Sequence, residues 1–259
     1  MQEIVRVAYR YTCMLSKSQI SFIKSLHQKK YRKENGIFII EGIKTIVEFL
    51  KSDYQLHSIY YTPKISATLP KVSTNINLFE VTETELQKIS TLQMPQGILA
   101  LVHIPSKKEI NINLLKNQFS LVLDDVQDPG NLGTIIRTAD WFGIKNVICS
   151  ENTVEAYNPK TVQSTMGSLC RVNVQYTSLN SFLAQAKLPI YGALLNGANI
   201  YQTQWGKEGL ILLGNEGHGI GTALIEKINF PVTIPRFGDA ESLNVAVSAA
   251  IFCSEVCRS

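Results

Sequence analysis

Apolar residues recur along this chain in short continuous runs, separated by stretches with a helical pattern. From residue 119 onward the runs are almost wholly apolar, which is typical of strands buried on both faces of a parallel sheet. Such strands alternating with helices predict an α/β domain. The strands expected in this part are Ser120–Leu123, Asn146–Ser150, Pro189–Leu195, Gly209–Leu213 and Pro231–Ile234.

The first hundred residues show the same alternation in shorter elements. Strands are expected at Ile37–Ile40, His57–Thr62, Leu78–Val81 and Ile98–Ile104, and helices at Glu41–Lys51 and Glu83–Ile89. We therefore predict two domains, a small α/β domain over residues 16–104 and a larger one over residues 118–259. A polar, proline-led linker over residues 105–117 joins them.

The chain ends with a long helix of small and apolar residues, which follows the stretch IPRFGDAES. Ser242 stands where an N-cap belongs, and the helix is expected from Leu243 onward. Asn244 is the one polar amide in the first turn of a helix that otherwise reads as buried.

Composition indicates a folded protein with an uneven distribution of charge. Of the 259 residues, 45% are hydrophobic and 18% are charged, which argues against disorder. Residues 1–110 carry 15 basic and 9 acidic side chains, whereas residues 111–259 carry 10 and 12. The basic excess lies in the first domain and favours an anionic partner there, with an ordinary solvated face as the alternative.

Six of these cations fall within Ser16–Lys33, a stretch without an acidic residue and with a helical pattern. This density favours contact with phosphates, although cations also suit the last turn of a helix. The residues predicted to contact phosphates are Lys17, Lys24, Lys29, Lys30, Arg32 and Lys33.

Five cysteines without a CxxC pair indicate reduced thiols, so we expect a cytoplasmic protein with no metal. Cys253 and Cys257 share a helix face and are expected to pack in the core. The chain shows no secretion signal and no run as long as a membrane span. Whether translation starts at Met1 or at Met14 stays open.

Three stretches rich in polar residues and glycine follow predicted strands: LDDVQDPGNLGTIIRTADWFG, LILLGNEGHGIG and IPRFGDAESLNVAVSAA. Because ligands of parallel sheets bind outside the carboxyl ends of the strands, we expect one shared site. Gly217 and Gly219 begin a dinucleotide fingerprint, but Thr222 stands where its third glycine belongs. The spacing therefore disfavours a nucleotide-dependent oxidoreductase.

In the first of these stretches Asn131 is expected just before a helix that carries Arg137 among apolar neighbours. The planar fork of a guanidinium suits a phosphate or a polarised hydroxyl.

In this order, the three stretches resemble motifs one, two and three of the SpoU (TrmH-like) RNA ribose methyltransferases of the SPOUT superfamily. The first domain, through KKYRKENGIFIIEGIKTIVEFLK and VTETELQKISTLQMPQGILALVHIP, resembles the substrate-binding domain of that family. The resemblance implies S-adenosylmethionine as methyl donor, an RNA ribose 2′-hydroxyl as acceptor, and a homodimer. It also implies a parallel-sheet SPOUT domain with a deep trefoil knot, next to a small N-terminal α/β RNA-binding domain.

The same resemblance implies the residues of the site. Its polar catalytic positions match Arg137, Asn131, Glu216 and Asn244. Its cofactor-binding positions match Leu195, Asn196, Gly197, Leu213, Gly214, Asn215, Gly217, Ile234, Pro235, Ser242 and Leu243. For Asn131 and Ser242, helix capping is the structural alternative.

Several alternatives stay open. Ribosomal RNA is favoured over transfer RNA because the first domain resembles those of ribosomal-RNA enzymes, and a non-catalytic RNA-binding module is the further alternative. Arg137 is either a true base or a group that orients the ribose and stabilises negative charge.

Overall fold

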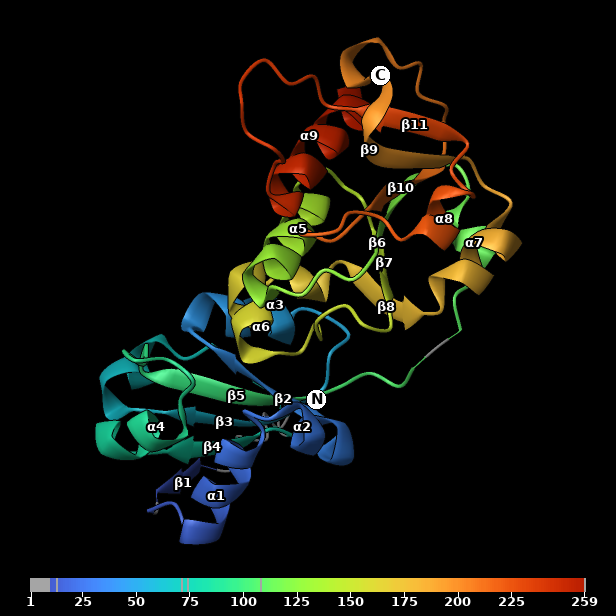
Figure 1. Ribbon diagram of the computed structural model, residues 1–259. Coiled ribbons are helices and arrows are strands. Elements are labelled where there is room, and N and C mark those ends of the chain that lie inside the picture. Colours follow the sequence, from blue (N-terminus) through green and yellow to red (C-terminus); the bar gives the residue numbers. More distant parts are fainter. Residues whose placement is uncertain (1–9, 13, 71, 74, 108, 259) are drawn as a thin grey trace. The chain divides into compact units, whose positions relative to one another are not determined.

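The computed structural model describes residues 10–12, 14–70, 72–73, 75–107 and 109–258 (Figure 1). The chain divides into two compact units. The first comprises Met1–Ser106 and Tyr157–Cys170, and the second comprises Lys107–Ala156 and Arg171–Ser259. Within the described ranges, no helix is long and apolar enough to cross a membrane.

The first unit contains a five-stranded sheet in the order β1-β4-β3-β5-β2. β4 is parallel to β1 and β3, whereas β5 is antiparallel to β3 and β2. The strands are β1 (Arg10–Thr12), β2 (Ile37–Glu41), β3 (Leu56–Tyr61), β4 (Asn77–Glu80) and β5 (Ile98–His103). The four predicted strands are confirmed to within one residue at each end, and β1 is absent from the prediction.

Helices pack on the sheet of the first unit. They are α1 (Lys17–Ser25), α2 (Lys29–Asn35), α3 (Ile43–Leu50), α4 (Glu83–Ile89) and α6 (Pro159–Thr165). Ile23 of α1 and Leu86 of α4 share a buried cluster with Ile39 of β2. The neighbouring side chain on β2, Phe38, points to the opposite face and packs against Phe49 of α3.

Two stretches belong to a different unit from the one that the strand pattern predicts. Tyr157–Cys170 belongs to the first unit by its contacts, although the predicted second domain spans residues 118–259. There the ring of Tyr157 packs on Phe38, with 4.7 Å between centroids. Leu115, from the predicted linker, is buried in the core of the second unit. Each stretch therefore belongs to the unit in whose core its apolar side chains are buried.

The basic stretch forms two helices, where the sequence predicts one. Ser16 caps α1 through a capping box with Gln19, and α1 ends before Leu26. The reason for the break is Arg32, whose Nη1 donates hydrogen bonds of 2.9 Å to the carbonyls of Leu26 and His27. Arg32 is 1% exposed. Its guanidinium therefore holds the turn between the helices, and the prediction that it contacts RNA is corrected.

The second unit contains a six-stranded sheet in the order β11-β9-β10-β6-β7-β8, and every neighbouring pair is parallel. The strands are β6 (Phe119–Leu123), β7 (Asn146–Ser150), β8 (Asn173–Thr177), β9 (Ile190–Asn199), β10 (Gly209–Leu213) and β11 (Phe230–Thr233). The predicted parallel sheet is confirmed. β8 escapes prediction because it is an edge strand with polar residues and no fully buried position.

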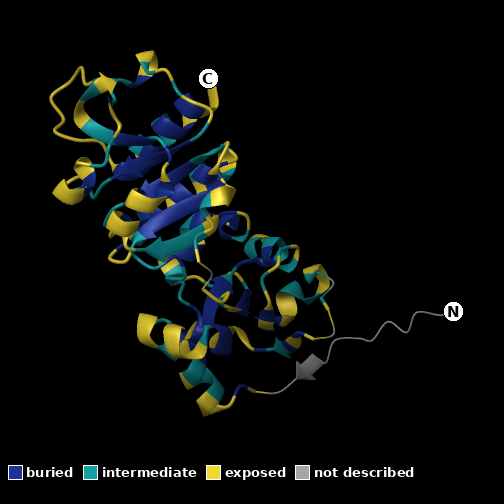
Figure 2. Ribbon diagram, turned by 90° about the vertical axis from the view of Figure 1, so that its right-hand side faces the viewer, coloured by how far each residue is buried: buried dark blue, intermediate teal, exposed yellow. Residues whose placement is uncertain are grey.

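Helices cover both faces of this sheet (Figures 1 and 2). They are α5 (Pro129–Trp141), α7 (Leu179–Ala186), α8 (Thr222–Ile225) and α9 (Val245–Arg258). Leu183 of α7 and Leu224 of α8 share a buried cluster with Leu212 of β10. α5 and α9 pack against each other and against the sheet.

Four short 3-10 helices complete the described elements. They are η1 (Pro63–Thr68), η2 (Ile112–Leu115), η3 (Ser168–Cys170) and η4 (Ile200–Gln202).

Candidate functional site

A cavity of about 820 Å³ opens at the carboxyl ends of β10 and β11, where β9 extends beyond its pairing with β10. Its wall is formed by the middle of β9, the loop after β10, the loop between β11 and α9, and one side of α9. This is the edge at which parallel sheets bind ligands, because strand ends and loop backbones converge there. The second and third motif stretches line this cavity, and the first reaches its wall through the hydrogen bond from Asn131 to Glu216.

Nine of the eleven predicted cofactor-binding residues line this cavity. They are Leu195, Leu213, Gly214, Asn215, Gly217, Ile234, Pro235, Ser242 and Leu243. Most of the wall is backbone and apolar side chain, which suits a largely uncharged ring system held by main-chain hydrogen bonds.

Asn196 and Gly197 do not line the cavity, and the structure gives Gly197 another role. A Cβ at this position would lie 2.6 Å from the backbone of Pro231 and Val232. Only glycine permits β9 to approach β11 so closely, at the irregularity in their pairing between Pro231 and Val232. Gly197 therefore shapes the strand pair behind the cavity.

Three of the four predicted catalytic residues form one hydrogen-bonded chain. The Nδ2 of Asn244 donates to the Oδ1 of Asn131 at 3.0 Å, and the Nδ2 of Asn131 donates to the Oε1 of Glu216 at 2.5 Å. Asn244 directly precedes α9, Asn131 lies in α5, and Glu216 lies in the loop after β10. Glu216 lines the cavity, so the chain begins at its wall.

The helix caps differ from the prediction at both motifs. Asn244, instead of Ser242, caps α9, because its Oδ1 accepts hydrogen bonds from the backbone N–H groups of Ala246 and Val247 at 2.9 and 3.3 Å. Asp128 caps α5, which begins at Pro129. Asn131 lies inside the first turn, so its side chain is free to bridge Asn244 and Glu216.

Arg137 is exposed on α5 and lies outside the cavity wall. Within the described part of the chain, its guanidinium has no hydrogen-bond or ion-pair partner. Six residues after Asn131, it lies about 9 Å further along the helix axis. The structure thus brings Asn131, Glu216 and Asn244 together and leaves Arg137 on the surface of the same helix.

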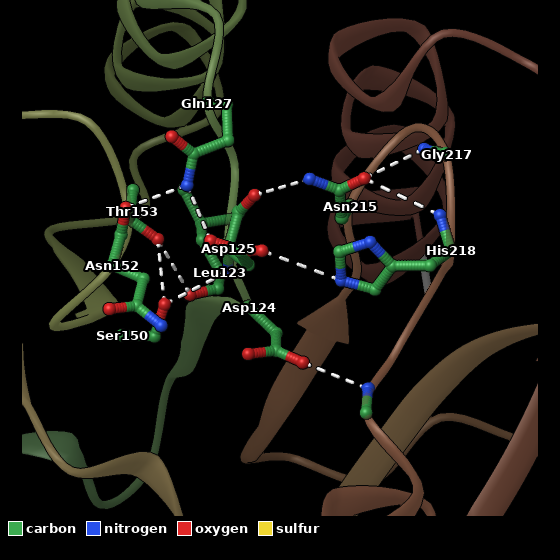
Figure 3. Close-up of polar contacts among 11 residues, drawn as sticks. Leu123, Asp124, Asp125, Gln127, Ser150, Asn152, Thr153, Asn215, Gly217 and His218 are labelled. Atoms are coloured by element: carbon green, nitrogen blue, oxygen red, sulfur yellow. Dashed lines mark hydrogen bonds and ion pairs between the residues drawn. The ribbon is translucent and has the colours of Figure 1, made fainter.

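Asp125, to which the sequence assigns no role, ties the loop after β6 to the loop after β10 (Figure 3). Its φ of 58° lies in the left-handed region, which a short polar side chain tolerates. Its N–H donates to the Oγ of Ser150 at 2.9 Å, and its carbonyl accepts from the Nδ2 of Asn215 at 2.6 Å. Its carboxylate accepts from Gln127 and lies 3.4 Å from the Nε2 of His218.

His218 was also missed, although it stands inside the motif GNEGHG. Asn215 holds this turn, because its Oδ1 accepts from the N–H groups of Gly217 and His218 at 2.7 and 3.4 Å. The Oδ2 of Asp124 accepts from the N–H of Gly221 at 2.9 Å and fixes the far end of the loop. A histidine flanked by glycines after a strand is the signal that could have indicated a wall residue.

Two further residues without a predicted role line the cavity, Arg236 and Phe237. Both are exposed, in a loop where every residue from 236 to 244 is exposed. The sequence signal for both is a basic residue followed by an aromatic residue within the third motif stretch.

The five lysines of the predicted RNA-contacting set are all exposed in the first unit: Lys17, Lys24, Lys29, Lys30 and Lys33. Lys30 forms an exposed ion pair of 4.0 Å with Glu34. Such a pair contributes little to stability, so Lys30 remains available to another anion.

The cysteines contribute to packing. Cys149 and Cys253 are fully buried, and burial raises the pKa of the Cys253 thiol to about 12, with the neighbouring Cys257 as a smaller cause. Core packing is confirmed for Cys253, whereas Cys257 is exposed. Cys13 lies outside the described residues. In the part of the chain that the structure describes, His, Cys, Asp and Glu side chains form no group that could hold a metal ion.

Comparison with known protein families matches both parts of the chain. Residues 118–254 match the SpoU rRNA Methylase family, and residues 17–100 match the MRM3-like substrate binding domain. The chain is 37% identical to the 23S rRNA (guanosine(2553)-2′-O)-methyltransferase RlmP of Bacillus subtilis, over 88% of this chain and 91% of that one. It is 30% identical to the 23S rRNA (guanosine-2′-O-)-methyltransferase RlmB of Neisseria meningitidis, over 71% of this chain and 77% of that one.

Solved structures share the fold over nearly the whole chain. A structure from Porphyromonas gingivalis, assigned to the TrmH family, has a TM-score of 0.87 and 35% identity, covering 95% of this chain and 99% of that one. An rRNA methyltransferase from Sinorhizobium meliloti, solved with AdoMet bound, has a TM-score of 0.81 and 25% identity, covering 95% and 98%.

Proposed function

The chain belongs to the SpoU rRNA methylase family, and we propose on that premise that it transfers a methyl group from S-adenosylmethionine to a ribose 2′-hydroxyl of ribosomal RNA. The observation that carries this proposal is the cavity at the strand ends with the chain Asn244–Asn131–Glu216 leading from its wall. Ribosomal RNA is favoured over transfer RNA because RlmP and RlmB are both named for 23S rRNA. With that substrate, the protein acts in the cytoplasm.

S-adenosylmethionine fits the cavity in size and lining. The volume of about 820 Å³ falls within the roughly 300–1,000 Å³ of small-ligand pockets. Backbone groups of Leu213–Gly214 and Ile234–Pro235 can bond an adenine edge without a charged side chain. The nine lining residues named above would hold the cofactor, while Asn196 and Gly197 would support the wall. When bound, the cofactor supplies an electrophilic methyl group.

The protein itself must hold the 2′-hydroxyl in line and stabilise the charge that develops on its oxygen. A guanidinium with a pKa above ~12 is a poor base, so we assign Arg137 to orienting the ribose and stabilising the developing alkoxide. Asn131 is held on one side by Asn244 and on the other by Glu216, so these three residues would fix the ribose in one pose.

A homodimer is part of the proposal. On α5, Trp141 is 85% exposed one turn beyond Arg137, and Val247 on the adjacent α9 is half exposed. Exposed aromatic and apolar side chains on two packed helices are typical of a surface that a second subunit covers.

A deep trefoil knot in the second unit is also proposed. A Cβ at Gly214 would lie 2.2 Å from the backbone carbon of Gly219, and a Cβ at Gly197 would lie 2.6 Å from that of Pro231. Backbone segments in the turn after β10 and in the β9–β11 pair therefore approach with no room for a side chain between them, and a threaded path requires close packing of this kind.

Ribose-methylation mapping of total RNA from a strain lacking the gene tests the function. We expect one methylation to be lost from ribosomal RNA and restored by the wild-type gene. Loss from transfer RNA alone would assign the other substrate. Unchanged methylation, together with no S-adenosylmethionine binding in calorimetry, would favour the non-catalytic RNA-binding module.

Replacing His218 by alanine is expected to weaken S-adenosylmethionine binding by up to about fivefold. The side chain links the wall of the cavity to Asp125, with 3.4 Å between Nε2 and Oδ2, and an exposed contact between a histidine and a carboxylate is worth at most about 1 kcal/mol. Calorimetry at low and high salt measures this loss. Asp125→Asn keeps a residue that tolerates the left-handed backbone and should lose the same amount. Additive losses in the double variant would contradict a direct pair.

A further inference from the structure

We propose that Phe237 stacks on the nucleobase of the nucleotide whose ribose is methylated, and that Arg236 contacts a phosphate next to that nucleotide. This inference rests on the proposed function and deepens it, because it names the side chains that recognise the substrate at the mouth of the cavity.

The position of Phe237 is not explained by folding. Its side chain is 96% exposed, yet it lines the cavity. The surrounding residues 236–244 are all exposed, so its own loop buries none of the ring. An apolar ring left in water gains nothing for the fold, whereas it gains much by covering an apolar or aromatic ligand.

Other apolar side chains surround the same cavity. Leu195 is 75% exposed and Leu243 is 48% exposed, and both line it. Leu195 comes from the middle of β9, and Phe237 and Leu243 come from the loop before α9. Apolar side chains therefore form part of the rim, together with the exposed polar residues Arg236, Glu241 and Ser242 of the same loop. Glu216 with its bonded Asn131 supplies further polar groups to the site.

The substrate of the proposed reaction carries a nucleobase, whose aromatic face can pack against this rim. The base is attached to the ribose carbon next to the one that carries the 2′-hydroxyl, so a ribose held for methylation places its base within the same site. Proteins recognise unpaired RNA bases by stacking them on aromatic side chains. Such a base must be unstacked from its neighbours, which indicates a single-stranded or loop nucleotide as the target.

The cation next to Phe237 fits the same ligand. Arg236 is the only basic residue between Ile234 and Asn244. Its Nη1 donates to the carbonyl of Ala240 at 3.4 Å, and it forms no ion pair within the described residues. Asp239 and Glu241 are also exposed in this loop. A guanidinium with free donors beside a stacked base can bond the phosphate that follows it.

The adenine of the cofactor is the competing occupant for the ring. The proposed adenosyl contacts are backbone groups of Leu213–Gly214 and Ile234–Pro235, which precede the exposed part of the loop. Phe237 lies two residues beyond Pro235, in the part of the loop where every residue is exposed.

The test compares Phe237→Ala, Phe237→Leu and Phe237→Trp with wild type, using S-adenosylmethionine and unmethylated ribosomal RNA. We expect the alanine and leucine variants to raise KM for RNA about tenfold or more, and the tryptophan variant to stay within about threefold, because stacking requires an aromatic ring. The affinity for S-adenosylmethionine, measured by calorimetry, should change less than twofold. Tyr201→Ala is the matched control, since Tyr201 is 54% exposed in the same unit but does not line the cavity.

The contribution of the base to binding is tested with two unmethylated RNA hairpins. The first carries the nucleotide that the enzyme methylates, and in the second that nucleotide keeps its ribose but lacks its base. Wild type should bind the abasic hairpin about tenfold more weakly, and Phe237→Ala should bind both hairpins equally. Arg236→Gln should weaken binding of both hairpins. It should also reduce the slope of log affinity against log salt concentration by about the amount due to one phosphate contact.

Three results would overturn the inference. An unchanged KM for RNA in Phe237→Ala would remove the stacking role while the proposed function stands. Weaker cofactor binding with normal KM for RNA would assign the ring to the adenine. A change of oligomeric state in size-exclusion chromatography would assign it to a subunit contact. If wild type methylates no RNA, the proposed function fails first and the inference with it.

Discussion

Replacing Arg137 by alanine is expected to abolish methyl transfer while the dissociation constant of S-adenosylmethionine stays within a few-fold of wild type. The guanidinium is exposed, has no partner among the described residues and lies outside the cavity wall, so its loss should leave the wall intact. Removing a group that stabilises developing negative charge costs about 10²–10³ in turnover. Single-turnover methylation and calorimetry on the same preparation measure both effects.

The control for Arg137 is Arg171, a second guanidinium in the same unit. Arg171 donates to both carboxylate oxygens of Asp140 at 2.8–3.0 Å, on the same helix that carries Arg137. Arg171→Ala should therefore keep nearly full turnover. Arg137→Lys keeps the charge but loses the fork, and it should recover only a small part of the activity. Normal turnover in Arg137→Ala would remove this residue from the mechanism.

A second large effect is expected from Gly214→Ala. The added Cβ would lie 2.2–2.4 Å from backbone atoms of Gly219 and Ile220, so backbone has to move and the clash cannot be relieved by a side-chain rotation. Overpacking of this kind costs about 1–3 kcal/mol, which corresponds to a fall in Tm of about 2 °C or more. Because the displaced segment forms the cavity wall, cofactor binding should be lost as well.

Gly238 provides the matched substitution. It lines the same cavity, its φ is not positive, and a Cβ there would meet nothing within 4 Å. Gly238→Ala should therefore melt within about 1 °C of wild type in scanning fluorimetry. Equal melting temperatures for the two variants would show that the backbone of Gly219 and Ile220 lies further than 2.2–2.4 Å from the Cβ position of Gly214.

The pattern of apolar runs predicted most of the fold because buried parallel strands carry a strong signal. Glu83–Ile89, Asn146–Ser150 and Gly209–Leu213 agree with the prediction at both ends. β8 carries polar residues on an edge, and a pattern that seeks apolar runs misses it. Unit membership was harder to predict, because Tyr157–Cys170 is placed by contacts with residues more than a hundred positions away.

Side-chain roles in the site were predicted less well than its location. Asn244 caps its helix and bonds Asn131 at once, and no local rule separates it from Ser242, two residues earlier. Arg32 reads as one cation among six until its carbonyl partners are known. The contact between Asp125 and His218 joins residues 93 positions apart, so no local sequence pattern predicts it.

The order of the cavity wall along the chain has a consequence for biosynthesis. Every lining residue falls between Ala193 and Phe252, whereas the first unit, including Tyr157–Cys170, precedes Ala193. Because domains generally fold in the order in which the ribosome makes them, the first unit is complete before any residue of the cavity wall emerges. Translation that pauses between residues 170 and 193 therefore leaves a chain in which all of the first unit has been made and none of the cavity wall has.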